Sequence, residues 1–131
     1  MKIKKTVLCV LSLVIILIGI WLVGTGFIKQ SSAFINSYSV SNDGSVMTID
    51  VGLGSSVGYI RKVNIHNQEG GKLCLDFISA FGGINGSIGA KSRFEIPIDK
   101  YCQEIAIYRS NNYYETVLEK DIDSGEWIRV K

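Results

Sequence analysis

The sequence predicts an all-β antiparallel sandwich of about seven strands, Ig-like or a small barrel, preceded by one N-terminal transmembrane helix. Three observations predict this fold class. Twenty-two consecutive residues without a charge lie near the N-terminus, from Val7 to Ile28. From about Tyr38 onward, apolar and polar residues alternate with the period of a β-strand. Turn-forming Gly, Asn and Asp residues interrupt this alternation roughly every ten residues, as in sandwiches and barrels.

The N-terminal segment has the features of a signal anchor. As a helix with a rise of about 1.5 Å per residue, residues 7–28 span about 33 Å, enough to cross a bilayer. Lys2, Lys4 and Lys5 precede this run, and only Lys29 follows it closely. The positive-inside rule therefore predicts residues 1–6 as a cytoplasmic tail, a single-pass helix in the cell membrane, and an extracellular C-terminal domain.

A cleaved signal peptide is the alternative to an anchor. Ser31, Ser32 and Ala33 supply small residues at the spacing that a signal peptidase accepts, and the protein would then be secreted. The apolar run is longer than the roughly 7 to 15 residues of a signal core, which favours the uncleaved anchor. Residues 29–37 are expected to be a short polar tether, and residues 38–131 the extracytoplasmic domain.

The strands of this domain follow from the alternation. Because proline donates no hydrogen bond to a neighbouring strand, we expect Pro97 to place its strand at a sheet edge or to lie where its polar side faces out of the ladder. Arg61 interrupts the apolar side of its strand. The expected strands lie near residues 47–53, 59–66, 73–81, 94–98, 105–107, 114–118 and 127–130.

Charge and composition exclude several functions. Four of the fourteen Lys and Arg residues lie in the first 29 residues, so residues 30–131 carry ten cations against twelve carboxylates. This acidic balance argues against nucleic-acid binding, which needs a basic surface. His66 is the only histidine, and we expect it to be solvated. The sequence indicates no metal site and no cofactor.

Four tracts carry a resemblance to known proteins. They are residues 55–62 (SSVGYIRK), 81–91 (FGGINGSIGAK), 104–109 (EIAIYR) and 125–127 (GEW). In this order they resemble small N-terminally membrane-anchored proteins of Gram-positive bacteria with one all-β extracytoplasmic domain. The resemblance implies a location and a fold class, and no activity.

The least acidic surface of the domain is the candidate binding site. We expect it to contain Tyr59, Arg61, Lys62 and Lys91, with Arg93 beside them, because arginine and tyrosine are favoured at binding anchors and loops on a β scaffold present them. The alternative is that Tyr59 packs inward with Val63 and Ile65, as the alternation suggests, and that the cations are simply solvated.

Two cysteines lie outside the apolar run, and an exported pair can form a disulfide. A Cys74–Cys102 bridge is therefore considered, although Cys74 alternates with Leu73 and Leu75, and nothing in the sequence brings the two thiols within bridging distance.

The function predicted from these observations is a membrane-anchored extracytoplasmic binding or interaction module of the bacterial cell envelope, without evident catalysis. Its expected partners are the lipid bilayer, through residues 7–28, and an envelope polymer or a membrane protein. The alternative is a small envelope hydrolase that uses a carboxylate pair such as Glu95 with Asp99 or Asp121 with Asp123.

Overall fold

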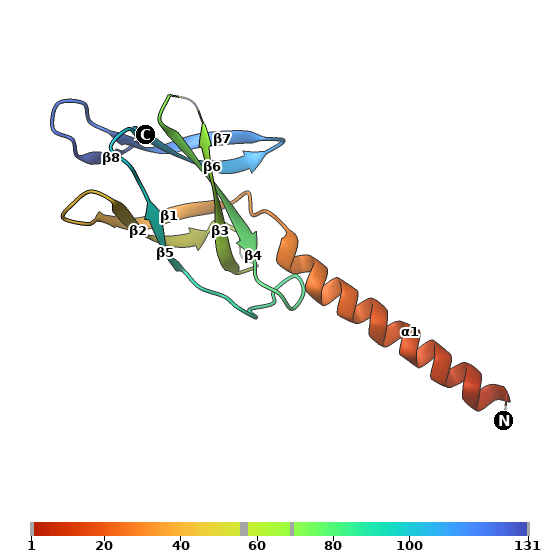
Figure 1. Ribbon diagram of the computed structural model, residues 1–131. Coiled ribbons are helices and arrows are strands. Elements are labelled where there is room, and N and C mark those ends of the chain that lie inside the picture. The colour runs from red at the N-terminus through yellow and green to blue at the C-terminus, as the bar shows by residue number, and fades with distance from the viewer. Residues whose placement is uncertain (1, 56–57, 69, 131) are drawn as a thin grey trace.

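The computed structural model describes residues 2–55, 58–68 and 70–130. Ser56, Val57 and Glu69, which fall in two expected turn regions, lie outside the described residues. Within the described part, one long N-terminal helix is followed by eight strands in two sheets (Figure 1). The predicted fold class, an apolar helix followed by a β-sandwich, is confirmed.

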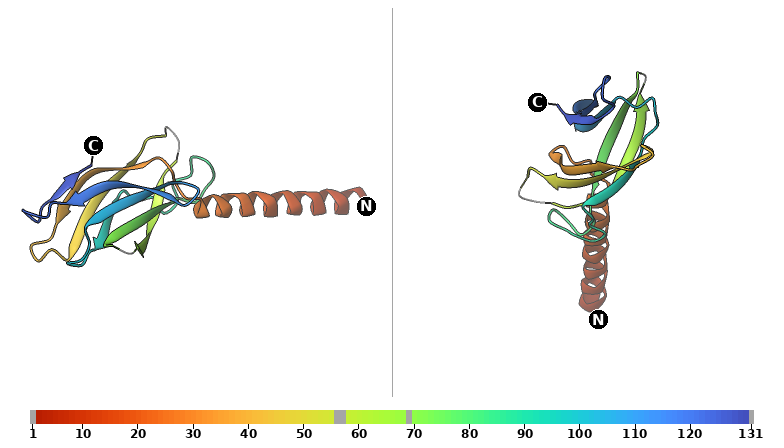
Figure 2. Two further views of the ribbon diagram at one scale, coloured as in Figure 1. Left: turned by 90° about the horizontal axis from the view of Figure 1, so that it is seen from above. Right: turned by 90° about the vertical axis from the view of Figure 1, so that its left-hand side faces the viewer.

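The helix projects from the β-domain as a straight rod (Figure 2). Helix α1 comprises Lys2–Gly24 and continues into a 3-10 turn, Thr25–Phe27. No residue of α1 is buried in the protein, and the apolar segment Lys2–Phe27 is long enough to cross a membrane.

Two sheets face each other across the core. The three-stranded sheet has the order β1-β2-β5 and the five-stranded sheet the order β3-β4-β6-β7-β8. The strands are β1 (Ala33–Val40), β2 (Val46–Leu53), β3 (Ile60–Gln68), β4 (Lys72–Ser79), β5 (Arg93–Pro97), β6 (Glu104–Ser110), β7 (Tyr113–Lys120) and β8 (Trp127–Arg129).

One strand pair departs from the expected antiparallel pattern. Strands β4 and β6 are parallel neighbours, with Leu73 opposite Ile105 and Leu75 opposite Ile107. The chain leaves the five-stranded sheet after β4, adds β5 to the other sheet, and returns as β6. Because β5 is inserted between them, β4 and β6 run in the same direction.

The tether expected at residues 29–37 is wrong over its second half, because residues 33–37 belong to β1. Ala33 and Ile35 are buried in the core and pair with Leu53 and Val51 of β2. A bulge between Ile35 and Ser37 shifts the register, so the alternation visible in the sequence is broken there. The remainder of the expected tether, residues 29–32, also contacts the domain, since the Gln30 amide donates to Phe77 O at 2.8 Å.

The core consists of the inner faces of both sheets. Phe77 lies against Phe94, with the ring centroids 5.8 Å apart. Met47, Ile49, Leu75, Ile96, Ile105, Ile107 and Leu118 are completely buried in this cluster. These residues are the alternating apolar positions of the sequence, which explains why the pattern predicted the strands.

The edge position and several turns agree with the sequence. Strand β5, which ends at Pro97, is an edge of its sheet, as predicted. Asn111 and Asn112 adopt positive φ angles of 45° and 63° in the β6–β7 turn, a conformation that asparagine tolerates. Hydrogen bonds from Ser41 and then Ser45 lower the pKa of Asp43 to about 2 in the β1–β2 turn.

Arginine side chains close one side of the sandwich. Arg109 of β6 donates to Ala33 O at 2.7 Å, and Arg129 of β8 donates to Ile35 O and Asn36 O, both at 2.7 Å. Carbonyl groups along β1 are thereby satisfied by the opposite sheet. On this side the two sheets are joined by charge-assisted hydrogen bonds, which are stronger than neutral ones.

Candidate functional site

The predicted surface lies at the opposite side of the sandwich, where the edge strands β3 and β5 face each other. We call this side the β3–β5 edge. A hollow of about 540 Å³ opens there between the two strands. It is lined by Arg61, Lys62, Val63, Lys91, Arg93, Phe94 and Glu95. Strand β3 supplies Arg61 and Lys62, and the segment before β5 supplies Lys91, so three of the four predicted residues lie together here.

The cations of this hollow differ in what they contact. Arg93 pairs with Asp50 at 3.3 Å, and this contact lowers the pKa of Asp50 and raises that of Arg93. The Lys91 ammonium lies 5.2 Å from the centre of the Phe94 ring. Lys62 is exposed, and among the described residues it has no hydrogen-bond or ion-pair partner. The lysine charges are therefore accessible to a partner.

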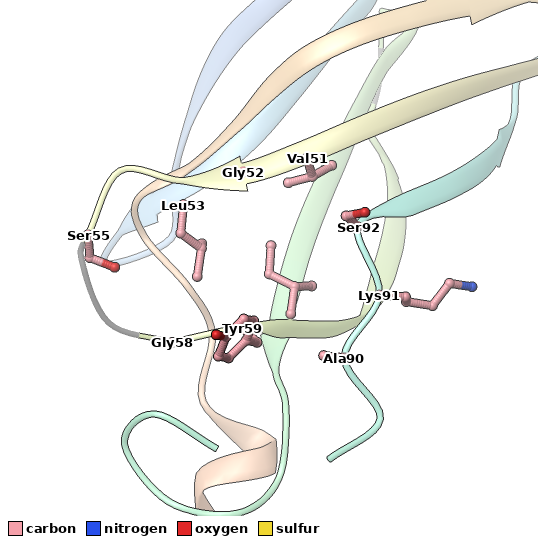
Figure 3. A pocket seen from close by; sticks show the side chains of 10 residues that line it. Val51, Gly52, Leu53, Ser55, Gly58, Tyr59, Ala90, Lys91 and Ser92 are labelled. Atoms are coloured by element: carbon pink, nitrogen blue, oxygen red, sulfur yellow. The ribbon is translucent and has the colours of Figure 1, made fainter. Parts of the chain in front are cut away.

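Tyr59 lies in a second hollow of about 450 Å³, which shares Lys91 with the first (Figure 3). Val51, Leu53 and Ile60 give this hollow an apolar wall. Tyr59 is 48% exposed, so the alternative in which it packs inward is wrong. A bulge between Ile60 and Lys62 shifts the register of β3 and places Ile60, not Tyr59, in the core.

Arg61, which also lines the hollow, makes contacts with the helix end that the sequence did not predict. Its guanidinium group donates to the carbonyl oxygen of Gly26, with Nε at 2.9 Å, and stacks 4.3 Å from the centre of the Phe81 ring. The Phe27 ring lies 5.5 Å away on the helix side. Arg61 therefore attaches the end of the helix to the domain. Its guanidinium group already contacts Gly26, Phe27 and Phe81.

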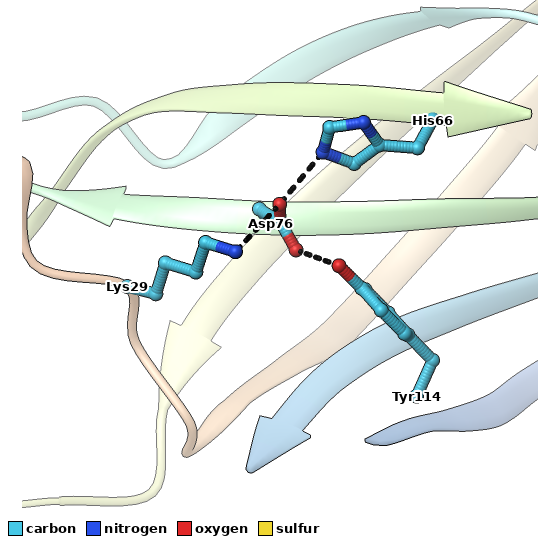
Figure 4. A network of polar contacts seen from close by, with 4 residues as sticks. All are labelled: Lys29, His66, Asp76 and Tyr114. Carbon is cyan, nitrogen blue, oxygen red and sulfur yellow. Dashed lines mark hydrogen bonds and ion pairs between the residues drawn. The ribbon is translucent and has the colours of Figure 1, made fainter. Parts of the chain in front are cut away.

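A polar network that the sequence did not indicate lies on the outer face of the five-stranded sheet (Figure 4). Its centre is Asp76 of β4, whose side chain is 1% exposed. His66 Nε2 lies 2.7 Å from Oδ2, the Tyr114 hydroxyl donates to Oδ1 at 2.7 Å, and Lys29 Nζ lies 3.4 Å from Oδ2. The His66 side chain is 54% exposed, as expected for a solvated histidine, but its contact with Asp76 was not predicted.

The network is arranged to hold a charged carboxylate. Burial raises the pKa of Asp76, but the hydrogen bonds from Tyr114 and His66 and the charge of Lys29 lower it by more, so it lies below its usual value. Burial and the bond to Asp76 raise the pKa of Tyr114 to about 12. Both oxygens of Asp76 are occupied, so the carboxylate joins Lys29, next to the helix, to three strands of the sheet.

The considered disulfide is absent from the structure. Cys74 and Cys102 are both buried free thiols. Cys102 belongs to the core cluster, whereas Cys74 alternates with the core residues Leu73 and Leu75 and so lies on the other face of β4. The sheet thus separates the two side chains.

The carboxylate pairs of the hydrolase alternative lie in turns or at the surface. Asp99 accepts a hydrogen bond from the Tyr101 amide at 2.8 Å, and Asp121 accepts one from the Asp123 amide at 2.9 Å. Glu95 is exposed on β5. Among residues 2–55, 58–68 and 70–130, no group of three or more His, Cys, Asp or Glu side chains is placed to hold a metal ion.

Comparisons of the chain with protein-family models, with curated proteins and with solved structures find no match. The structure itself defines a class: a two-sheet β-domain carried by an apolar helix long enough to span a membrane. In this chain, one side of the sandwich is closed by arginines and the other side is open and carries accessible lysines.

Proposed function

We propose that this protein is a single-pass, membrane-anchored binding module of a bacterial cell envelope, and that its extracytoplasmic domain binds an anionic partner along the β3–β5 edge. The partner is an acidic envelope polymer or the acidic surface of another membrane protein. Lys62 and Lys91 supply the charge, and Tyr59 supplies an aromatic surface beside Lys91.

The surface of α1 supports the anchor. Apart from Leu22, its large apolar side chains are 45–78% exposed, from Val14 to Ile3, and the helix meets the β-domain at its C-terminal end, near Trp21 and Leu22. A fully apolar helix surface of this length is stable in lipid and would aggregate in water. Lys2, Lys4 and Lys5 favour a cytoplasmic N-terminus and an external domain.

The observation that carries the binding proposal is the difference between the two sides of the sandwich. At the β1 side, Arg109 and Arg129 donate hydrogen bonds to backbone carbonyls of the opposite sheet. At the β3–β5 edge, Lys62 and Lys91 line a hollow, and their ammonium groups have no carboxylate partner among the described residues. Accessible cations around a concave surface attract anionic partners and accelerate their association.

The arrangement also explains which ligands fit. The two hollows meet at Lys91, so an extended chain can contact Tyr59 and the lysines together. A polymer with a repeated negative charge satisfies more than one ammonium at once, which a single small anion does not. This site needs no movement of the core, because its residues lie on edge strands and adjoining loops.

Binding is tested with the full-length chain in phosphatidylcholine nanodiscs, whose headgroups carry no net charge. The probe is fluorescent poly(glycerol phosphate), and uncharged dextran is the control polymer. The double variant Lys62→Glu/Lys91→Glu should bind the probe about tenfold more weakly, and the affinity of the unchanged protein should fall with added salt.

The matched control is Lys72→Glu/Lys100→Glu, which changes the net charge equally at the other end of the domain. It should retain most of the affinity, because surface charges separated by more than about 10 Å are largely screened. Equal losses of affinity in the two double variants would show that net charge alone causes the effect. This result would contradict a binding site at the β3–β5 edge. The orientation is tested separately: protease added to intact wall-less cells should degrade the domain without lysis.

A further inference from the structure

The loop after β4 packs directly on the end of the helix. We call residues 82–89, GGINGSIG, the glycine loop. The Gly82 amide donates to Leu22 O at 3.1 Å, and the Gly83 amide donates to the Thr25 hydroxyl at 3.0 Å. A Cβ atom at Gly83 would lie 2.8 Å from the Trp21 ring, so only glycine allows this approach. The glycine loop is therefore fixed at the level of residues 21–25.

That level is the outer boundary of the apolar span. A hydrocarbon core of about 30 Å accommodates about twenty helical residues. Counted from Val7, the first residue of the uncharged apolar run, these residues end near Gly26. Trp21, Leu22 and Thr25 thus belong to the last two turns of the span, and the loop that touches them lies at the same depth.

The side chains of the glycine loop suit this depth. Ile84 and Ile88 are 72% and 64% exposed, so neither is covered by the domain. The loop contains no charged residue. Phe27, on the adjoining 3-10 turn, is 65% exposed and extends the same apolar surface. Apolar residues grouped at the base of a spanning helix are typical of contact with lipid.

Several backbone groups in and beside the loop have partners within the protein. Unsatisfied amides are costly close to lipid, so irregular segments there need internal partners. Phe81 and Ile88 exchange both of their backbone hydrogen bonds at 3.1 Å, and the Gly86 amide donates to Gly83 O at 3.1 Å. The Ala90 amide donates to Ser87 O at 3.0 Å.

We infer that the glycine loop is a second membrane contact, in which Ile84 and Ile88 enter the outer interface of the bilayer beside α1. This inference rests on the proposed anchoring by α1 and adds a partner, the lipid itself, to the folded domain. The helix and the loop then contact the bilayer at two points. These contacts hold the domain in one orientation against the membrane surface.

The test places an environment-sensitive fluorophore on single cysteines of the full-length chain in phosphatidylcholine vesicles. Cys9 is exposed and is replaced by serine, whereas Cys74 and Cys102 are buried. The labelled variants are Ile84→Cys, Ile88→Cys, Val23→Cys as the marker of α1, and Ile122→Cys as the matched control. Ile122 is an isoleucine that is 92% exposed in the distant β7–β8 turn.

We expect the labels at positions 84, 88 and 23 to show blue-shifted emission and quenching by nitroxide-bearing lipids, and the label at position 122 to show neither. If positions 84 and 88 behave like position 122 while position 23 is quenched, the loop contact is overturned and the anchor stands. If position 23 is also unquenched, α1 is outside the bilayer and both proposals fail.

Discussion

The guanidinium group of Arg61 donates two hydrogen bonds to one carbonyl oxygen, that of Gly26 at the end of the helix. Arg61 belongs to β3 and Gly26 to the 3-10 turn that continues α1. The contact therefore joins the segment proposed to span the membrane to an edge strand of the sandwich. It explains why a charged residue interrupts the apolar side of β3.

Replacing Arg61 should weaken this junction. The variant Arg61→Ala loses charge-assisted hydrogen bonds and the stacking on Phe81, at a cost of about 2 kcal/mol in the free energy of unfolding. Lys62→Ala, the exposed neighbour, should change it by less than about 0.5 kcal/mol. Urea unfolding in detergent, followed by tryptophan fluorescence, measures both. Equal stabilities of the two variants would contradict the assigned role of Arg61.

Two glycines near the end of the helix should differ in their tolerance of a methyl group. A Cβ atom at Gly26 would lie 2.0 Å from the Phe81 ring, whereas a Cβ at Gly24 meets nothing within 4 Å. Gly26→Ala should therefore cost about 1–3 kcal/mol of stability, as overpacking does. Gly24→Ala should be neutral or stabilising, because alanine is the better helix former.

A second variant tests whether the Gly26–Phe81 contact causes the loss. In a Phe81→Ala background the obstructing ring is gone, and Gly26→Ala should then add little to the loss. Persistence of the full effect in that background would place its cause outside the Gly26–Phe81 contact.

Asp76 should make stability depend on acid pH. Its folded pKa is lowered, so its contribution is present above the unfolded pKa, about 3.9, and is lost as the pH falls through the lower folded value. At pH 7, Asp76→Asn should cost about 1–3 kcal/mol. The difference from the unchanged protein should shrink below pH 4. Asp123→Asn, in an exposed turn, is the control, and a pH-independent difference for Asp76→Asn would refute the charged carboxylate.

Tyr114 should make the free energy of unfolding depend on alkaline pH. Its pKa is raised to about 12, so the neutral phenol contributes stability that is complete below the unfolded value of about 10 and is lost as the pH rises through about 12. Tyr114→Phe should cost about 1 kcal/mol at neutral pH and flatten this alkaline loss. Tyr113→Phe changes the 60% exposed neighbour and should leave the profile intact. Identical profiles for the two variants would exclude the hydrogen bond to Asp76 as the cause.

The thiols of Cys74 and Cys102 should be protected rather than paired. Burial raises the pKa of both thiols, so little thiolate is available for alkylation near neutral pH. Iodoacetamide should modify neither residue in the folded protein and both in urea without a reductant. A mass spectrum in which both remain unmodified in urea would demonstrate the bridge that the structure lacks.

The sequence predicted those elements whose pattern is local. Alternation in β2 and β5 and the apolar run of α1 are visible within about ten to twenty residues, because the period of each element repeats inside it. Strand β1 was missed because the bulge after Ile35 breaks its alternation. The parallel pairing of β4 and β6 depends on β5 joining the other sheet, which no local pattern reveals.

The candidate site was predicted in part for the same reason. Tyr59, Lys62 and Lys91 could be grouped because they flank two glycine-rich segments that end beside each other. The use of Arg61 could not be foreseen, because Gly26 lies 35 positions away in the chain. The Asp76 network joins Lys29 and Tyr114 across 85 positions of sequence, and only the sheet order brings them together.

If the chain is exported as proposed, the burial of Ala33 restricts when a signal peptidase could act on it. Ala33 is fully buried as the first residue of β1, and its carbonyl is held by Arg109. A peptidase that cuts after Ala33 needs this segment extended in its own active site, so folding and processing compete for the same residues. Once β1 has paired with β2, the bond after Ala33 lies in a folded strand and is inaccessible to such a peptidase. For a chain exported as proposed, retention of the helix would then depend on the rate of domain folding relative to the rate of cleavage.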